Sequence, residues 1–424
     1  MATGDVLVIG NGSREHAFAW KLRQSGHVKR IYVASGNTGI HGIGENIAIN
    51  PGNIADLCSF ALEKDIDLTI VGTEMPLKLG IVDLFRANEL TIFGPTAAAA
   101  RVETSKLYAK DLMMEEGIPT AQFRTFVSHE TAYAHIHQRG YPLVIKANGL
   151  AGGKGSYVCR GINDAEVALQ ELMVDRIYDE EGDIVIIEDF LEGEEISLHF
   201  LCHGTIMAPL ITARDAKTLK EMGVGPNTGG MGTFAPVPRF TDHNLLHVEQ
   251  TIVKPLLNVL NRRGVSFTGC LYPGLMLTAD GPYVVEFNAR FGDPETQPLM
   301  ALMKGDLFLL LKSWAQGILV DPIFQNDMHA VCVVLCSKEY PLSANNPVPI
   351  YGIADAEALS DDITVFHGAT KLVNSRLHTN GGRVLSVTAT GKTLEEARLL
   401  TYRACEYIYF EGMQYREDIA SHIN

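Results

Sequence analysis

The sequence predicts a multidomain protein of the α/β and α+β classes that begins with a doubly wound parallel sheet. Its 424 residues are enough for about three domains. Up to about residue 95, apolar strands alternate with amphipathic helices, the pattern of a parallel sheet with crossover helices. Beyond residue 120 the strands are shorter and form hairpins, and residues 326–424 have the pattern of a small α+β domain.

The composition limits the partners and the compartment. Hydrophobic residues make up 46% of the chain, the formal net charge is −15, and Lys and Arg form no long run. Nucleic acid and anionic membrane surfaces are therefore not expected as main partners. No apolar run approaches the ~20 residues of a membrane-spanning helix, and no signal peptide is expected. The seven cysteines form no CxxC pair, which predicts core thiols and a cytoplasmic protein.

The first element is an apolar strand over residues 5–10, followed by a glycine-rich turn over 11–16 and a helix. A phosphate at such a helix N-terminus meets free N–H groups and the helix dipole. A dinucleotide is not expected, because Glu15 replaces the third glycine of GxGxxG and the second strand does not end in an acid. Arg14 and His16 favour a phosphorylated sugar, and a plain tight turn is the alternative.

The parallel sheet continues with strands over 67–72 and 91–94 and with helices between them. Ligands bind in the loops at the carboxyl ends of such strands. Glu74 follows the first of these two strands and is therefore a candidate ligand contact, although it could equally cap a helix. A helix over 97–116 comes next and carries Lys106.

A glycine-rich loop then follows the strand over 141–147, which carries the cation Lys146 near its end. The loop, residues 148–155, holds Lys154 and four glycines, so its N–H groups can close over phosphates. It is not a P-loop, because GxxxxGK[ST] does not fit and a strand follows instead of a helix. A flexible hairpin tip is the alternative.

Acidic residues and a second glycine-rich loop occupy the middle of the chain. A buried strand over 184–191 contains Glu188, and several acids, including Glu195, follow it. These acids could bind the amine and the ribose hydroxyls of a nucleotide, or could simply lie on the surface of a turn. A long loop over 214–232 has five glycines between 223 and 232. Such loops in compact enzymes are usually functional or disordered.

The strand over 283–287 continues into a polar stretch with metal-binding character. Side chains two apart in a strand share one face, so Glu286, Asn288 and Arg290 are expected on the same side. A carboxylate beside an amide oxygen suits Mg²⁺ that bridges phosphates. Arg290 could hold an anion through two hydrogen bonds. A charged strand end that faces water is the alternative.

The C-terminal third offers few candidates for chemistry. An apolar helix over 295–317 is expected to anchor the polar strand against the core. The last domain should contain a strand over 330–337, another over 382–390, and a helix over 394–410. Arg383 follows two glycines, and we expect it in a turn rather than against substrate.

Two levels of resemblance to a known family can be read from these residues. An ordered series resembles the ATP-grasp ligases: Lys106, Lys146 with its glycine loop, Glu188-x-x-Leu191, Glu195 and Glu286-x-Asn288. Three motifs resemble, more narrowly, the phosphoribosylamine–glycine ligase (glycinamide ribonucleotide synthetase) family: GNGSREH, GPNTGGMG and EFNARFGDPETQ. The last two motifs are long and specific, and the resemblance spans essentially the whole chain.

The resemblance implies a central ATP-grasp fold and three domains. The expected bounds are 1–104, 105–325 with a lid subdomain at about 120–192, and 326–424. It also implies an enzyme of de novo purine biosynthesis that uses ATP, with Mg²⁺ or Mn²⁺, to join glycine to 5-phosphoribosylamine through glycyl phosphate. A monomer is consistent with the sequence, which holds no feature that decides the stoichiometry.

The resemblance also implies residue roles. Contacts to ATP are expected from Lys106, Lys146, Gly149, Gly152, Gly153, Lys154, Gly155, Glu188, Leu191 and Glu195. The metal would be held by Glu286 and Asn288. Phosphoribosylamine and glycine would meet Gly10, Asn11, Gly12, Arg14, Glu15, His16, Glu74, Asn227, Thr228, Gly229, Gly230, Met231 and Gly232. The expected catalytic residues are Lys146, Asp215, Arg290 and Asp293.

Three positions depart from the family pattern. Residues 272–276 lack the third metal-binding acid that many ATP-grasp enzymes carry on that strand. Asn148 stands where an aspartate is expected, and Ala216 where a histidine is expected. Two alternatives to the ligase are a sibling ATP-grasp enzyme that acts on another carboxylate, and a regulatory protein that binds ATP without turnover.

Overall fold

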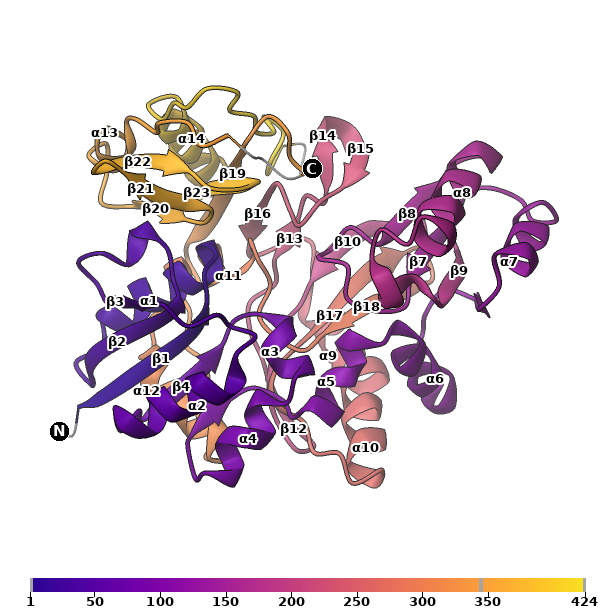
Figure 1. Ribbon diagram of the computed structural model, residues 1–424, viewed down its shortest axis with the longest axis horizontal. Coiled ribbons are helices and arrows are strands. Elements are labelled where there is room, and N and C mark those ends of the chain that lie inside the picture. The colour runs from indigo at the N-terminus through magenta and orange to yellow at the C-terminus, as the bar shows by residue number, and fades with distance from the viewer. Residues whose placement is uncertain (1–2, 343–345, 422–424) are drawn as a thin grey trace.

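A parallel five-stranded sheet forms the N-terminal part of the computed structural model, which describes residues 3–342 and 346–421 (Figure 1). The strand order is β3-β2-β1-β4-β5. Both faces of β1 are buried, as the continuous apolar run at residues 6–9 requires. The predicted doubly wound sheet is therefore confirmed. Its elements are β1 (Gly4–Gly10), α1 (Ser13–Arg23), β2 (Val28–Ser35), β3 (Glu45–Ile47), α2 (Ile54–Glu63), β4 (Leu68–Val71), α3 (Glu74–Lys78), α4 (Ile81–Ala87) and β5 (Ile92–Phe93).

The lid subdomain is a four-stranded antiparallel sheet that projects from the rest of the molecule, on the right of Figure 1. Its order is β6-β9-β7-β8, and two helices cover one side, so that Ile136, Ile145 and Leu169 are among its buried side chains. The glycine-rich loop connects β7 to β8. The elements are β6 (Phe123–Phe126), α7 (His129–Ile136), β7 (Leu143–Ala147), β8 (Ser156–Cys159), α8 (Ile162–Leu169) and β9 (Val185–Asp189).

A second antiparallel sheet lies between the lid and the N-terminal sheet, in the order β10-β17-β11-β12, with β18 paired to β17. The β17–β18 hairpin turns at residues 279–280, close to the predicted position. Phe18 from the N-terminal unit packs with Met300 and Trp314, which joins the two units in one core. The elements are β10 (Glu194–Ser197), β11 (Phe200–His203), β12 (Ile206–Pro209), α9 (Asp242–Val248), α10 (Lys254–Arg262), β17 (Thr268–Thr278), β18 (Gly281–Asn288), α11 (Thr296–Leu302) and α12 (Leu307–Ala315).

The C-terminal sheet takes strands from two distant parts of the sequence, in the order β13-β16-β19-β23-β20. Its first strand lies in the segment predicted as a long loop, and its second strand begins at the last residue of that segment. The C-terminal elements thus share a sheet with residues next to the central domain. The elements are β13 (Arg214–Asp215), β16 (Gly232–Ala235), β19 (His329–Cys336), α13 (Ile353–Glu357), β20 (Ile363–His367), β21 (Thr370–Val373), β22 (Arg376–Thr379), β23 (Arg383–Gly391) and α14 (Leu394–Cys405).

Three predicted elements differ from the structure, each for a local reason. The helix over 97–116 is two helices, α5 (Ala97–Thr104) and α6 (Lys106–Glu116), because extended Ser105 caps α6 by accepting from the Tyr108 N–H. The helix over 295–317 is also two, since extended Met303 ends α11 and Asp306 caps α12. The loop over 214–232 contains a hairpin, formed by β14 (Thr218–Lys220) and β15 (Val224–Asn227).

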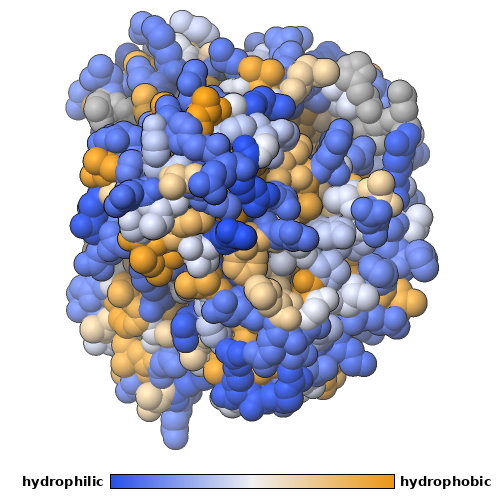
Figure 2. Space-filling view, turned by 90° about the vertical axis from the view of Figure 1, so that its right-hand side faces the viewer, coloured by the Kyte–Doolittle hydropathy of each residue, from blue (hydrophilic) through white to orange (hydrophobic). Residues whose placement is uncertain are grey.

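The surface and the thiols agree with the composition. On the face shown in Figure 2, hydrophilic side chains predominate and apolar ones are scattered among them in small groups. No helix in the described residues is long and apolar enough to cross a membrane. All seven cysteines lie within the described residues, where they are buried and form no disulfide, as predicted for core thiols.

Candidate active site

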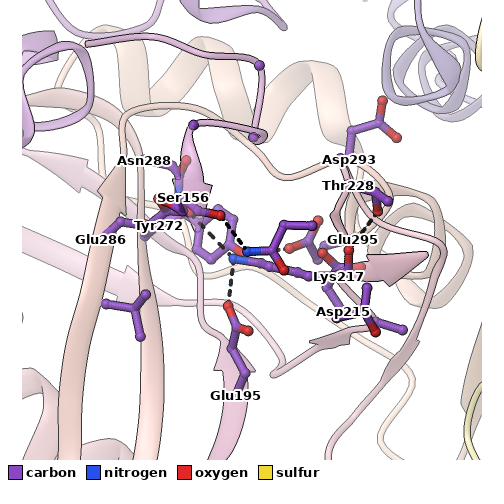
Figure 3. A pocket seen from close by; sticks show the side chains of 18 of the residues that line it. Ser156, Glu195, Asp215, Lys217, Thr228, Tyr272, Glu286, Asn288, Asp293 and Glu295 are labelled. Atoms are coloured by element: carbon purple, nitrogen blue, oxygen red, sulfur yellow. Dashed lines mark hydrogen bonds and ion pairs between the residues drawn. The ribbon is translucent and has the colours of Figure 1, made fainter. Parts of the chain in front are cut away.

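A cavity of about 1060 Å³ lies where the N-terminal unit, the lid, the β17–β18 hairpin and the C-terminal sheet meet (Figure 3). Most of the predicted site residues line it, although they come from every part of the chain. Five predicted residues, all described, lie outside the lining: Gly10, His16, Lys154, Gly230 and Met231. The fold therefore brings most of the predicted site residues into one cavity and leaves these five outside its lining.

Glu286 and Asn288 project from the end of β18 into the cavity (Figure 3). The pairing of β17 and β18 shifts at Val285, so Gly274 lies opposite Glu286 where the third acid is missing. Burial by itself raises the pKa of Glu286, but nearby Lys217, Lys106, Lys146 and Arg290 together lower it to about 2. Glu286 is therefore an ionised carboxylate at physiological pH.

The donor set at this position fits a divalent cation that is completed by its ligand. One ionised carboxylate and one amide are oxygen donors of the kind that Mg²⁺ and Mn²⁺ prefer. Among the described residues, no group of three His, Cys, Asp or Glu is placed to hold a metal by itself. Phosphate oxygens and water would have to supply the remaining ligands.

Lys217 is a cation that lies beside both Glu195 and Glu286. Its Nζ lies 2.6 Å from Glu195 Oε1 and 3.5 Å from Glu286 Oε1 (Figure 3). Burial lowers the pKa of Lys217, but Glu195 and Glu286 raise it well above its ordinary value. Lys217 thus joins the predicted ribose-binding residue to the predicted metal ligand, a connection that the sequence did not suggest.

A buried group of three charges lies at the lid side of the cavity. Glu188 is only 3% exposed, and its two oxygens lie 3.0 Å from Lys110 Nζ and 2.8 Å from Lys146 Nζ. Burial raises the pKa of Glu188, but the two lysines lower it below its ordinary value. Lys146 also donates to Val285 O at 2.9 Å. Glu188 therefore holds the predicted phosphate-binding lysine in place, besides facing the cavity.

The segment before the lid loop fixes a second lysine. Lys106 Nζ donates to Gly149 O at 3.0 Å, and burial lowers the pKa of this lysine. Asn148 Oδ1 accepts from the Leu107 N–H at 2.8 Å and from Ser105 Oγ at 3.2 Å. The side chain at 148 therefore caps α6, a task that an amide performs without the charge of aspartate.

Two acids lie close together on the C-terminal side of the cavity (Figure 3). Glu295 Oε1 accepts from Tyr272 OH at 2.6 Å and from Ser197 Oγ at 2.9 Å. Asp215 Oδ1 is buried and has no hydrogen-bond partner among the described residues. Burial and the neighbouring Glu295 raise the pKa of Asp215 well above its ordinary value. This pair is suited to a positively charged ligand group.

Arg290 brings positive charge to the cavity, where it pairs with two further acids. Its Nη2 lies 2.9 Å from Glu103 Oε1, and its Nε lies 3.6 Å from Glu74 Oε2. Burial lowers the pKa of Arg290, but these two acids raise it above its ordinary value. Glu103 also accepts from the Ala289 N–H at 2.8 Å, so it fixes the backbone beside Arg290. Glu74 therefore contacts a predicted catalytic residue as well as the cavity.

The N-terminal turn differs from a phosphate-binding loop. Glu15 accepts from the Gly12 N–H at 2.6 Å, so its own carboxylate occupies the N-terminus of α1. A Cβ at Gly10 would lie only 2.5 Å from Glu15 Cδ, and Gly10 has φ +134°, so this position requires glycine. Arg14 pairs with Glu15 at 2.7 Å and donates to Phe291 O at 3.0 Å. An anion at this turn would meet Arg14 rather than the helix N–H groups.

His16 faces the C-terminal domain instead of the cavity. Its Nδ1 accepts from the His367 N–H at 2.8 Å, and Phe366 packs edge-on against its ring. Burial, followed by the nearby His367, lowers the pKa of His16 to about 3, and burial lowers that of His367 to about 4. Both rings are therefore neutral parts of a domain interface, which differs from the predicted substrate contact.

This histidine pair should make stability depend on pH. The unfolded state binds protons near pH 6.5 and the folded state only near pH 3 to 4, so the free energy of unfolding should fall as pH falls from 6.5 towards 4. Each histidine contributes up to about 1.4 kcal/mol per pH unit. In urea titrations, His16→Asn should show a flatter pH dependence than wild type, and exposed His41→Gln should not. Parallel curves for wild type and His16→Asn would contradict the assignment.

The lid loop and the GPNTGGMG loop meet above the cavity. A Cβ at Gly149 would lie 1.5 Å from Glu181 Oε2, so a larger residue there would require the Glu181 side chain to move. Thr228 Oγ1 donates to Lys217 O at 2.7 Å, which ties the second loop to Lys217. Lys154 points away from the cavity and donates to Pro341 O at 2.5 Å, whereas it was predicted to contact ATP. Met231 is buried in a small core with Cys336 and Tyr340.

Five residues of the site were missed from the sequence: Glu103, Lys110, Lys217, Glu295 and Arg383. Arg383 was assigned to a turn, but it begins β23 and donates to Asp293 Oδ2 at 3.0 Å and to Gly229 O at 2.6 Å. For Lys217 and Glu295 a signal was available, since each lies two residues from a predicted site residue in the same motif. Lys110 also carried a signal, because it lies four residues after Lys106 and therefore on the same face of α6, whereas Glu103 and Arg383 come from other elements.

Comparisons with known proteins cover almost the full chain. Family models of phosphoribosylglycinamide synthetase match in three parts: the N domain at residues 4–103, the ATP-grasp (A) domain at 104–296 and the C domain at 330–422. A phosphoribosylamine–glycine ligase from Caldanaerobacter subterraneus subsp. tengcongensis is 42% identical over 98% of this chain and 99% of its own length. The corresponding protein of Halalkalibacterium halodurans is 44% identical, with 98% and 96% covered.

A solved structure leads to the same family. The crystal structure of phosphoribosylamine–glycine ligase from Thermotoga maritima is similar with a TM-score of 0.83 and 31% identity. The match covers 98% of this chain and 100% of that chain. Because family models, relatives and structure agree over almost every residue, the chain belongs to the phosphoribosylglycinamide synthetase family.

Proposed function

We propose that this protein joins glycine to 5-phosphoribosylamine with ATP, through glycyl phosphate, and releases ADP and phosphate in purine biosynthesis. The observation that carries the proposal is one cavity that gathers two lysines, an ionised carboxylate–amide pair, and a separate acid pair beside an arginine. The first two groups suit the phosphates of ATP with a metal. The third suits an amino acid, which has both an ammonium and a carboxylate.

The proposed ATP site lies between the lid sheet and β18. Lys106 and Lys146 each have three N–H donors and use only one or two on the protein, so each has donors left for phosphate oxygens. Glu195 is proposed to meet the ribose hydroxyls. Apolar side chains from α6, the lid sheet, the segment after β9 and β17 are proposed to enclose the base: Met113, Val144, Val158, Leu191 and Met276.

We assign Glu286 and Asn288 as the protein ligands of Mg²⁺ or Mn²⁺. A bound divalent cation would neutralise phosphate charge and polarise the γ-phosphate. Because Lys217 already contacts Glu286, the same carboxylate would have a cation beside it in both the ligand-free and the loaded state. Lys217 thus helps to keep Glu286 ionised before a metal binds.

Glycine is proposed to bind between Arg290 and the acid pair. Its carboxylate would face Arg290, and its ammonium would face Asp215 and Glu295. The hydroxyls of Tyr272 and Ser197 fix Glu295, so this acid needs no reorganisation when the ammonium binds. The unpartnered Oδ1 of Asp215 would gain the partner that it lacks in the cavity.

The chemistry then follows in two steps that conserve atoms and charge. A carboxylate oxygen of glycine attacks the γ-phosphorus, the bond to the bridging oxygen breaks, and ADP leaves. The amine of phosphoribosylamine next attacks the carbonyl carbon of glycyl phosphate, phosphate leaves, and the nitrogen gives up a proton. Glycyl phosphate hydrolyses in water, so a lid that excludes water protects it.

Omission of single components tests the proposal. ADP release is measured with Mg²⁺ and ATP, using glycine and phosphoribosylamine formed in place from ribose 5-phosphate and ammonia. Release that requires both co-substrates supports the ligase. Release that ignores glycine but responds to another carboxylate would overturn the substrate assignment. Binding of ATP without any release would favour a regulatory protein.

Asp215→Asn should raise the KM for glycine, on the order of tenfold to a hundredfold, because an amide cannot pair with an ammonium as a carboxylate does. The KM for ATP should change less, since neither Lys106 nor Lys146 is among the groups that act most strongly on the pKa of Asp215. Steady-state ADP release at varied glycine and ATP separates the two constants. Exposed Asp280→Asn is the matched control. An unchanged KM for glycine would place the ammonium elsewhere.

A further inference from the structure

Tyr340, in the C-terminal domain, touches both glycine-rich loops above the cavity. Its side chain is almost fully buried, and its OH accepts from the Gly229 N–H at 2.8 Å. Lys154, in the lid loop, lies with Nζ 5.8 Å from the Tyr340 ring and donates to the carbonyl of the next residue, Pro341. One residue therefore contacts the lid on one side and the GPNTGGMG loop on the other.

The two loops also touch each other directly. Asn227 Nδ2 donates to Ser156 O at 3.0 Å, which joins the second loop to the first residue of β8. A Cβ at Gly153 would lie 3.5 Å from Thr228 O and 3.6 Å from Gly229 Cα. The backbone of the lid loop therefore lies close to the second loop. A movement of either loop would change the packing surface that it offers to the other.

The C-terminal domain fixes the other side of this contact. Arg383 donates to Gly229 O and to Asp293 O, both at 2.6 Å, so the backbone of Gly229 is held by Tyr340 at its N–H and by Arg383 at its carbonyl. A Cβ at Gly382 would lie 2.3 Å from Tyr340 Cδ2, so the ring packs directly on the backbone there. Tyr340 is therefore a rigid support rather than a mobile surface residue.

We propose that Tyr340 is a positioning residue that couples closure of the lid to the conformation of the Gly229 loop. The inference rests on the proposed function, in which the lid covers ATP and the loop borders the glycine site. Lid closure seats Lys154 on the Tyr340–Pro341 segment, and the same tyrosine holds Gly229. Binding of nucleotide should therefore favour binding of glycine, and thermodynamic linkage requires the converse by the same factor.

Two variants remove one side of the connection each. Tyr340→Phe loses the hydroxyl that accepts from Gly229 and keeps the ring beneath Lys154. Lys154→Met loses the donor to Pro341 and keeps a stem of similar length. The measurement is the Kd of a non-hydrolysable ATP analogue with Mg²⁺, by calorimetry, without glycine and at saturating glycine. The ratio of the two Kd values is the coupling factor.

Wild type should show a coupling factor above one, and each variant should bring it towards one. The double variant should be no lower than the single ones, because both break the same connection. Exposed Tyr351→Phe, in the same domain, should keep the wild-type factor. A wild-type factor of one, or unchanged factors in both variants, would overturn the inference. If the proposed function itself is wrong, wild type will fail to bind glycine or to release ADP, a result distinct from unchanged coupling.

Discussion

Glu286→Gln should lower kcat on the order of a thousandfold and leave the fold intact. Glutamine keeps the shape of the side chain but removes the charge that would hold a divalent cation against the phosphates. Lys217, Lys106 and Lys146 would then face the cavity with one negative partner fewer. ADP release at saturating ATP, glycine and phosphoribosylamine measures the loss, and a titration with Mg²⁺ shows whether the metal requirement rises.

The control for this variant is Glu63→Gln, which changes an exposed carboxylate on α2 and should retain full activity. Thermal unfolding of Glu286→Gln should show one cooperative transition like that of wild type. A near-normal kcat with an unchanged Mg²⁺ requirement would mean that Glu286 does not bind the metal. The assignment of Asn288 as a metal ligand would then be contradicted as well, because Glu286 and Asn288 were assigned together as a pair at the end of β18.

Lys217→Met should lower kcat/KM for ATP on the order of a hundredfold, a loss that no motif predicted. Without the ammonium, Glu195 and Glu286 lose the cation that both contact. Lys106, Lys146 and Arg290 would still lower the pKa of Glu286, but they would offset its burial less completely, so this pKa should rise from about 2. Since the ionised carboxylate is the form that binds a cation, the acid limb of the pH–activity profile should move to higher pH.

Lys217→Arg separates charge from geometry, because it keeps the cation and should preserve much of the activity and the wild-type acid limb. Lys220→Met changes an exposed lysine on the neighbouring β14 and serves as the matched control. An acid limb that stays at the wild-type pH in Lys217→Met would show that Lys217 does not govern the ionisation of Glu286. Equal losses in Lys217→Met and Lys220→Met would point to a general effect of charge.

The N-terminal sheet shows how much of the fold can be predicted from the periodicity of apolar residues. Strands β1 and β4 are buried on both faces, and amphipathic helices separate the apolar segments of this region, so the order of the segments was enough to predict a parallel sheet, although not which strands pair. Glu286, Asn288 and Arg290 were found for a similar reason, since the two-residue period of a strand puts them on one side. Local breaks were harder: Ser105 and Asp306 cap helices inside segments that look continuous.

The sequence by itself determined the family and the order of the sheets, and most of the residues that it singled out line the cavity, because these depend on periodicity and on motifs that are contiguous in the chain. Only the tertiary structure decided which charges are partners. Lys110 meets Glu188, Arg290 meets Glu103, and Arg383 meets Asp293 across separations that no local pattern encodes. It also turned His16 and Lys154 towards the C-terminal domain. The physical reason is that burial and charge pairing depend on neighbours brought together by folding, whereas backbone periodicity depends only on adjacent residues.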